Sequence, residues 1–185
     1  GQDSDVTLEL CAGRSSSDLA NNLGNLVSRL LHLAGRHCPD GLPGATIEED
    51  PERSLKADWE EARREILSAY EEFQFHLAME KTVGFITKLN RYAEIRAPWK
   101  LAKSEEARDR ELLGTSLTVL AEGLRLATEF LLPVMPEIAS RVLGLLGEAA
   151  PATWEGHLAW SDRLKGRTLA EKTILFPRLH LDDDK

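Results

Sequence analysis

The stretch from Ser16 to Leu33 constrains the fold most, because one of its faces is a continuous apolar stripe. Five leucines recur there at alternating steps of four and three residues: Leu19, Leu23, Leu26, Leu30 and Leu33. This spacing predicts an amphipathic helix whose leucine face must be covered by other helices. The hydroxyl of Ser16 or Ser17 is suited to accept a hydrogen bond from a free amide of the first turn, so we expect the helix to begin there.

Four further stretches show apolar residues at helical spacing. They predict helices over about 51–72 (with Ser54 as an alternative start), 75–96, 104–132 and 136–146. The residue before a proline is pushed out of helical geometry, so the helix that ends near Arg96 stops before Pro98 and presents Trp99 just beyond its end. No strand pattern alternates with these helices. The predicted fold class is all-α, an antiparallel bundle of about five helices with an irregular C-terminal tail.

The chain divides into three parts. We expect residues 1–15 to be an entry segment, 16–147 the helical bundle, and 148–185 a tail that packs back on it with its last residues disordered. The chain begins with Gly1 rather than Met, so we expect it to be part of a longer protein. It has no apolar run long enough for a membrane span and no secretory leader. The expected compartment is the cytoplasm.

Metal binding and catalysis have little support in the sequence. The two cysteines, Cys11 and Cys38, form neither a disulfide framework nor a zinc motif. The five histidines are not at the spacing of metal ligands, and no nucleophile elbow, phosphate-binding loop or metalloprotease motif is present. We therefore predict no catalytic residue, no metal site and no cofactor in this chain.

The distribution of charge is more informative than the net charge of -8. Residues 48–72 carry ten acidic and four basic side chains, whereas residues 73–103 carry six basic and two acidic ones. A basic segment on an acidic protein suits a polyanion such as nucleic acid, although a charged run is also typical of a solvated helix face.

Asn25 and Arg29 form a polar pair away from the leucine stripe. Residues four apart on a helix point the same way, and an amide beside a guanidinium can hydrogen-bond the flat polar edge of a nucleobase. The same pair also fits an ordinary solvated face. Both interpretations remain open from these residues alone.

Trp99 lies among basic residues at the predicted helix end. An exposed indole can stack an unpaired base, which contributes about 1–3 kcal/mol, while nearby cations bind phosphates. The indole could equally cap the core. Charge clustering marks these candidate phosphate contacts: Lys88, Arg91, Arg96, Lys100 and Lys103.

Four sequence blocks, in order along nearly the whole chain, resemble the C-terminal anticodon-binding domain of methionyl-tRNA synthetase, a class I aminoacyl-tRNA synthetase. The blocks are DLANNLGNLVSR (18–29), NRY with APWKLAK (90–92 and 97–103), LPVMP (132–136) and LFPR (175–178). The resemblance implies a helical bundle that recognises the CAU anticodon of methionine tRNA. It also implies that Asn25 and Arg29 hydrogen-bond the first anticodon base, that Trp99 stacks on it, and that Pro98 fixes the local backbone.

The resemblance further implies partners outside this chain. One partner is methionine tRNA, through its anticodon stem-loop. The other is a catalytic domain of the same enzyme, missing upstream of residues 1–15. That domain attaches methionine to the tRNA using ATP and Mg2+. The chain carries no catalytic signature of its own, so whether it is an enzyme by itself stays open, and we expect a monomer. The alternative is a free-standing helical protein-interaction module derived from such a domain.

Overall fold

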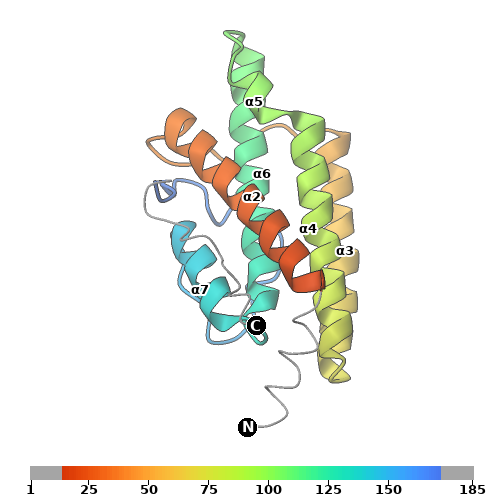
Figure 1. Ribbon diagram of the computed structural model, residues 1–185. Helices are drawn as coiled ribbons and strands as arrows, with labels where there is room; N and C mark the ends of the chain where they lie inside the picture. Colours follow the sequence, from red (N-terminus) through yellow and green to blue (C-terminus); the bar gives the residue numbers. More distant parts are fainter. Residues whose placement is uncertain (1–13, 172–185) are drawn as a thin grey trace.

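Two long helices, α3 (Asp50–Glu71) and α4 (Phe75–Arg96), lie side by side along one edge of the computed structural model, which describes residues 14–171 (Figure 1). A tight turn at Phe73 and Gln74 joins them, so they run antiparallel. α2 (Arg14–His37) crosses in front of α4 and α6 (Ala107–Leu131), and α7 (Pro136–Leu145) packs on α6. The described residues contain helices and no strands, which confirms the predicted all-α class.

α6 is the central helix of the bundle. Every residue from Leu113 to Leu131 is buried, because α2, α3, α4, α5 and α7 all pack against this helix. The leucines of α2 lie on its inner side, as their spacing predicts, and Leu19, Leu23 and Leu30 are each 1% exposed. Burial of these apolar side chains is the main force that holds the bundle together.

The observed helix ends lie within about three residues of the expected ones, with one correction. α2 begins at Arg14 and not at Ser16 or Ser17, so these serines lie within its first turn and the predicted cap is wrong. The helix propensity of serine is only moderately unfavourable, so the two serines do not prevent the helix from including them. α2 also continues four residues past Leu33, to His37. A further short helix, α5 (Pro98–Leu101), follows α4 directly.

Residues 146–171 form no regular helix or strand and lie against the bundle. The Trp59 indole nitrogen donates to the Leu158 carbonyl at 2.9 Å, and the Trp154 indole donates to the Glu129 carbonyl at 3.1 Å. The Leu42 amide donates to the Arg167 carbonyl. The expected entry segment up to residue 13, the block at 175–178 and the expected disordered end lie outside the described residues.

A charged network is buried between α6 and this irregular segment. Arg125 is fully buried and donates to Glu122 and Glu129, its neighbours on α6, and to the His157 carbonyl. Ser161 donates to Glu122 through its backbone amide at 3.1 Å. Burial raises the pKa of the Glu129 carboxyl above its ordinary value, although Arg125 opposes this shift. The network ties residues 157–161 to the central helix.

Gly24 provides a direct test of the α2 geometry. A Cβ at this position would meet no atom within 4 Å, so Gly24→Ala gains helix propensity without a clash. We expect the free energy of unfolding to rise by about 0.5–1 kcal/mol. The matched control is Gly123→Ala in α6, where the added Cβ would lie 2.4 Å from Leu89 Cδ2, so a loss of stability is expected. Urea denaturation measures both, and a destabilised Gly24→Ala protein would contradict this packing.

None of the helices in residues 14–171 combines the length and apolar character that crossing a membrane requires.

Candidate nucleic-acid interface

Three elements bring a candidate base-binding group together: the exposed face of α2, the last turns of α4, and α5. Asn25 and Arg29 lie one turn apart on α2 and are both exposed. The Arg29 guanidinium carbon lies 5.4 Å from the centre of the Trp99 ring, and Arg29 Nη1 donates to Glu94 Oε1 of α4 at 3.1 Å. A cation over an indole face is an attractive arrangement. Residues 70 positions apart in sequence therefore meet on one surface.

Trp99 is held at this surface by the junction between α4 and α5. Ala97 adopts a left-handed conformation with φ 44°, which caps α4 and starts α5 in a new direction. Pro98 is buried at the first position of α5, where its fixed φ suits a helix and its missing N–H costs nothing. Trp99 is half-buried: it packs partly on the core and keeps part of its indole at the surface.

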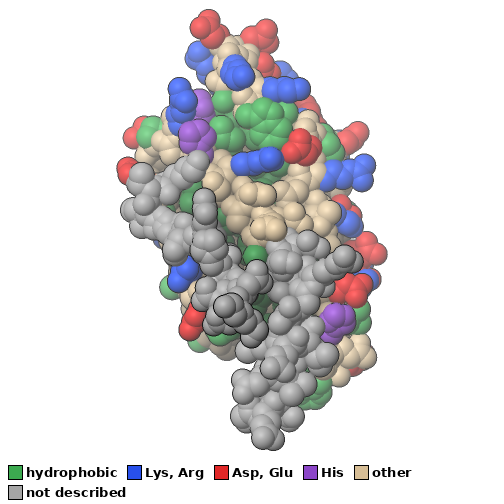
Figure 2. All heavy atoms as spheres, viewed as in Figure 1, with side chains coloured by type: hydrophobic (Ala, Val, Ile, Leu, Met, Phe, Trp, Pro, Cys, Tyr) green, Lys and Arg blue, Asp and Glu red, His purple; other side chains and the backbone are tan. Residues whose placement is uncertain are grey.

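Figure 2 shows the face of the bundle on which α2 and α5 lie. Hydrophobic side chains gather over α5 and the adjoining part of α2, with basic and acidic side chains at their edge. An aromatic surface with charged groups beside it is the arrangement that unpaired nucleotides use, because the base stacks while its polar edge and its phosphate find partners.

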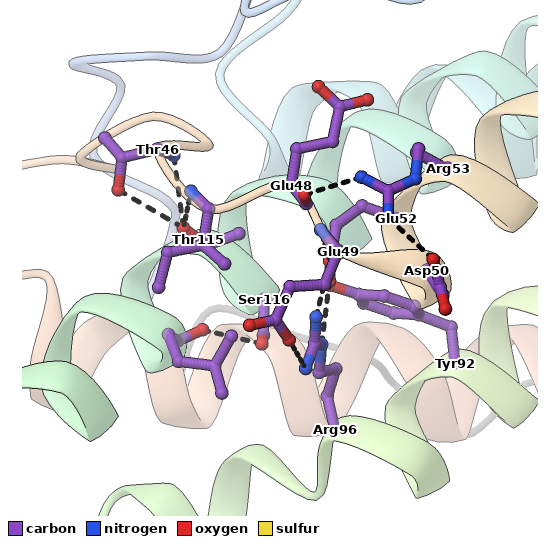
Figure 3. A network of polar contacts seen from close by, with 12 residues as sticks. Thr46, Glu48, Glu49, Asp50, Glu52, Arg53, Tyr92, Arg96, Thr115 and Ser116 are labelled. Atoms are coloured by element: carbon purple, nitrogen blue, oxygen red, sulfur yellow. Dashed lines mark hydrogen bonds and ion pairs between the residues drawn. The ribbon is translucent and has the colours of Figure 1, made fainter.

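Arg96 is a correction to the predicted phosphate contacts. Its side chain is 9% exposed and points from α4 toward the start of α3 (Figure 3). Arg96 Nε donates to Glu52 Oε1 at 2.7 Å and Nη1 donates to Glu49 Oε2 at 3.0 Å, while the Tyr92 hydroxyl donates to the same Glu52 oxygen at 2.7 Å. Its guanidinium is thus fully engaged inside the protein, so Arg96 does not face a nucleic-acid backbone.

The Glu52 carboxylate makes stability depend on pH. Its burial raises the pKa, but hydrogen bonds from Arg96 and Tyr92 outweigh burial and hold the pKa below its ordinary value. The unfolded chain therefore takes up this proton more readily than the folded chain, and the stabilisation is lost as pH falls below about 4.3.

This effect is measurable as the difference in unfolding free energy between the wild type and Glu52→Gln. We expect a difference that is constant from pH 7 to about pH 5 and that shrinks in more acidic solution. Urea denaturation at each pH provides the values. A difference that stays constant down to pH 3 would show that this carboxylate has an ordinary pKa.

The other predicted phosphate contacts differ in their surroundings. Lys88 lies on the side of α4 that faces α3, where it pairs with Asp58 at 2.7 Å. Arg91, Lys100 and Lys103 are exposed, and none of them has an ion pair among the residues that the structure describes. Lys100 and Lys103 adjoin Trp99 in sequence and share its short helix and the following turn.

A cavity of about 450 Å3 opens beside α5. Its lining includes the apolar side chains of Leu101 and Leu113, the cations Lys103 and Arg110, the carboxylate of Glu105, and His37, whose pKa is lowered by burial. It lies between the end of α2, the turn after α5 and the start of α6, next to the segment that carries Trp99.

The sequence interpretation missed Glu94 and Arg110. The sequence offers one indication for Glu94, because it is one of only two acidic residues in the basic segment 73–103. Arg110 lies in the first turns of α6, far along the chain from His37, and no spacing rule connects the two. Within residues 14–171, no group of three or more histidine, cysteine, aspartate or glutamate side chains could hold a metal ion.

Comparisons with known proteins point to one family, although no protein-family model matches the sequence. A methionine–tRNA ligase of Deinococcus radiodurans is 35% identical over 96% of this chain and 26% of its own length. That of Mycobacterium tuberculosis is 32% identical over 96% of this chain and 34% of its own length. This chain therefore spans only about a quarter to a third of these relatives.

The fold agrees with the sequence relatives. A crystal structure of the apo form of Mycobacterium tuberculosis methionyl-tRNA synthetase superposes with a TM-score of 0.78 and 32% identity, covering 89% of this chain and 33% of that one. A structure of the same enzyme bound by methionyl-adenylate gives a TM-score of 0.76.

Proposed function

This chain is homologous to a part of the methionine–tRNA ligases that makes up about a quarter to a third of their length, and from that premise we propose that it binds the CAU anticodon of methionine tRNA. The observation that carries the proposal is the meeting of Arg29, Glu94 and Trp99 at one exposed surface. A stacking surface, a hydrogen-bond donor and an acceptor stand within reach of one base. These are the three elements that recognition of an unstacked base requires.

In the proposed complex, the first anticodon base stacks on the Trp99 indole. The Arg29 guanidinium lies over that ring in the free protein, so the incoming base takes its place and the guanidinium moves to the edge of the base. Asn25, one turn earlier on the same face of α2, adds an amide to that edge. Arg29 is exposed, so this movement needs no repacking of the core.

Cytosine fits the charges of this site better than uracil does. Cytosine presents an amino donor at N4 and acceptors at N3 and O2, which complement the Glu94 carboxylate and the Arg29 guanidinium respectively. Uracil places an oxygen at position 4, which would face a carboxylate and find no donor. Two hydrogen-bond acceptors that face each other weaken the binding of uracil, and this difference gives specificity for cytosine.

Glu94→Gln tests this division of roles. The amide keeps the size of the side chain but carries both a hydrogen-bond donor and an acceptor, so it can pair with cytosine or with uracil. We expect the affinity ratio of a CAU hairpin over a UAU hairpin to fall about fivefold to tenfold, the lower part of the range for one base contact.

The matched control is Asp58→Asn, which also removes the charge of a carboxylate in an ion pair. Asp58 pairs with Lys88 at the contact between α3 and α4. Its CAU to UAU ratio should equal that of the wild type. An unchanged ratio in Glu94→Gln would remove Glu94 from base recognition.

The cavity beside α5 supports binding of more than one nucleotide. Lys103 and Arg110 outnumber the one carboxylate of the lining, Glu105, so the wall suits a phosphate, and the apolar lining suits a base that follows the stacked one. We assign these cations, together with Arg91 and Lys100, to the phosphate backbone. Lys88 contributes less, because Asp58 already neutralises it.

In the longer enzyme, this chain would select the tRNA while a catalytic part uses ATP and Mg2+ to attach methionine to it. That reaction takes place in the cytoplasm, and the chain acts on methionine tRNA as a monomer. We assign recognition of the anticodon to the described residues of this chain and the chemical step to the catalytic part.

A protein-interaction module is the second candidate function, and an exposed phenylalanine favours it. Phe73 is 79% exposed in the turn between α3 and α4, and its φ of 57° is unusual for a large side chain. A bulky residue in that conformation is costly, which is a reason to seek a function for it. This candidate predicts that the chain binds CAU and GAU hairpins equally weakly.

A further inference from the structure

Glu49 connects the two ends of the segment that carries Trp99. It is the last residue before α3, and its carboxylate accepts from Arg96 at the end of α4 and from Arg108 in the first turn of α6. Arg96 lies three residues before Trp99, and Arg108 lies nine residues after it. The segment 97–107, which contains α5, is thus held at both ends by one carboxylate.

Glu49 itself is fixed by its neighbour one turn along. Its backbone amide donates to Glu52 Oε2 at 2.9 Å, and Glu52 also accepts from Arg96 and Tyr92 inside the bundle. The Glu52 side chain is 1% exposed, so this part of the network is rigid. Figure 3 shows Glu49 and Glu52 both directed at Arg96. The anchor of the segment is therefore the first turn of α3.

The segment needs such an anchor because its first residue is strained. Ala97 has φ 44° and ψ 59°, a left-handed conformation that costs about 1–2 kcal/mol for a residue with a Cβ. Strained residues persist where the surrounding structure fixes them on both sides. Here Arg96 is bound one residue before Ala97, and Pro98 is buried one residue after it.

We propose that Glu49, with Arg96 and Arg108, is a positioning group that holds the Trp99 indole in the orientation needed for base stacking. We call these three residues the Glu49 clamp. The inference rests on the proposed function for its effect on RNA, but its effect on Trp99 is independent of any ligand. None of the three residues touches the base.

The exposure of the pair between Arg108 and Glu49 argues for a positioning role over a stabilising one. Arg108 is 67% exposed and Glu49 is 41% exposed. An ion pair so open to water contributes little to the free energy of unfolding. The same contact still restricts the segment that follows α5, because Arg108 has Glu49 as its partner across 59 residues of sequence.

The test compares Arg108→Ala and Glu49→Gln with the matched control Arg53→Ala. Arg53 forms an exposed ion pair with Asp50 in the same first turn of α3, and its hydrogen bonds go to Glu48 and Asp50 and not to the segment 97–107. Two quantities are measured in each protein: NMR relaxation of the Trp99 indole N–H, assigned with Trp99→Phe, and the affinity ratio of CAU over GAU hairpins at one fixed low salt concentration.

We expect increased motion of the Trp99 indole and a threefold to fivefold lower CAU to GAU ratio in Arg108→Ala and Glu49→Gln. Arg53→Ala should match the wild type in both quantities, and Arg108→Lys should restore most of the ratio. An unchanged indole signal, or a changed signal with an unchanged ratio, would overturn the positioning role. A wild type that binds both hairpins equally would overturn the proposed function, and the indole signal alone then decides whether the clamp orders Trp99.

Discussion

Arg125→Ala is expected to lower the free energy of unfolding by about 3–5 kcal/mol, the largest effect of any single change proposed for this protein. Arg125 is fully buried, and the Glu122 and Glu129 side chains beside it are each only 2% exposed. Removal of the cation leaves two carboxylates in the interior without a counter-charge, and the His157 carbonyl loses its donor. Domains of this size have a free energy of unfolding of about 5–15 kcal/mol, so Arg125→Ala would remove much of it.

Urea denaturation with circular dichroism measures this loss. The informative comparison is the triple variant Arg125→Met, Glu122→Gln and Glu129→Gln, which removes the buried charges together. Since no uncompensated charge remains, the triple variant should be more stable than Arg125→Ala alone. A loss below about 1 kcal/mol in Arg125→Ala would mean that water reaches this network and that residues 157–161 do not seal it.

Trp99→Ala is expected to weaken binding of a CAU hairpin by about tenfold to a hundredfold. The indole supplies the stacking surface, and base stacking on an aromatic side chain contributes about 1–3 kcal/mol. Trp99→Phe keeps an aromatic face and should lose much less. Fluorescence anisotropy with a labelled hairpin measures the affinities.

Folding of the Trp99 variants must be checked, because the indole also packs partly on the core. The urea midpoint of each variant provides that control. If Trp99→Ala folds and binds the CAU hairpin as the wild type does, the indole has only a packing role and the proposed site is wrong.

The helices could be predicted because their signals are local. Leucine spacing defines the buried face of α2, and Pro98 defines the end of α4. The same local reasoning places Asn25 and Arg29 on one exposed face and Trp99 beyond a helix end. The structure adds that these groups meet, which depends on how α2 crosses α4 and α6.

What the sequence did not reveal depends on partners that are distant along the chain. Charge clustering predicts Arg96 as a phosphate contact, but in the structure it hydrogen-bonds Glu52, 44 residues earlier, inside the bundle. Glu122 and Glu129 look like solvated positions of an amphipathic helix, yet α6 is buried on all sides. The spacing of residues along a helix predicts which of them share a face, but it does not show which other element covers that face.

A titration of the wild-type chain with CAU and GAU anticodon hairpins at one low salt concentration tests the central claim most directly. Salt must be fixed, because contacts to phosphates alone change the affinity by orders of magnitude. The account predicts tighter binding of the CAU hairpin and the loss of that preference in Trp99→Ala. Equal binding of both hairpins, or a preference that Trp99→Ala leaves intact, would contradict recognition of the anticodon at this surface.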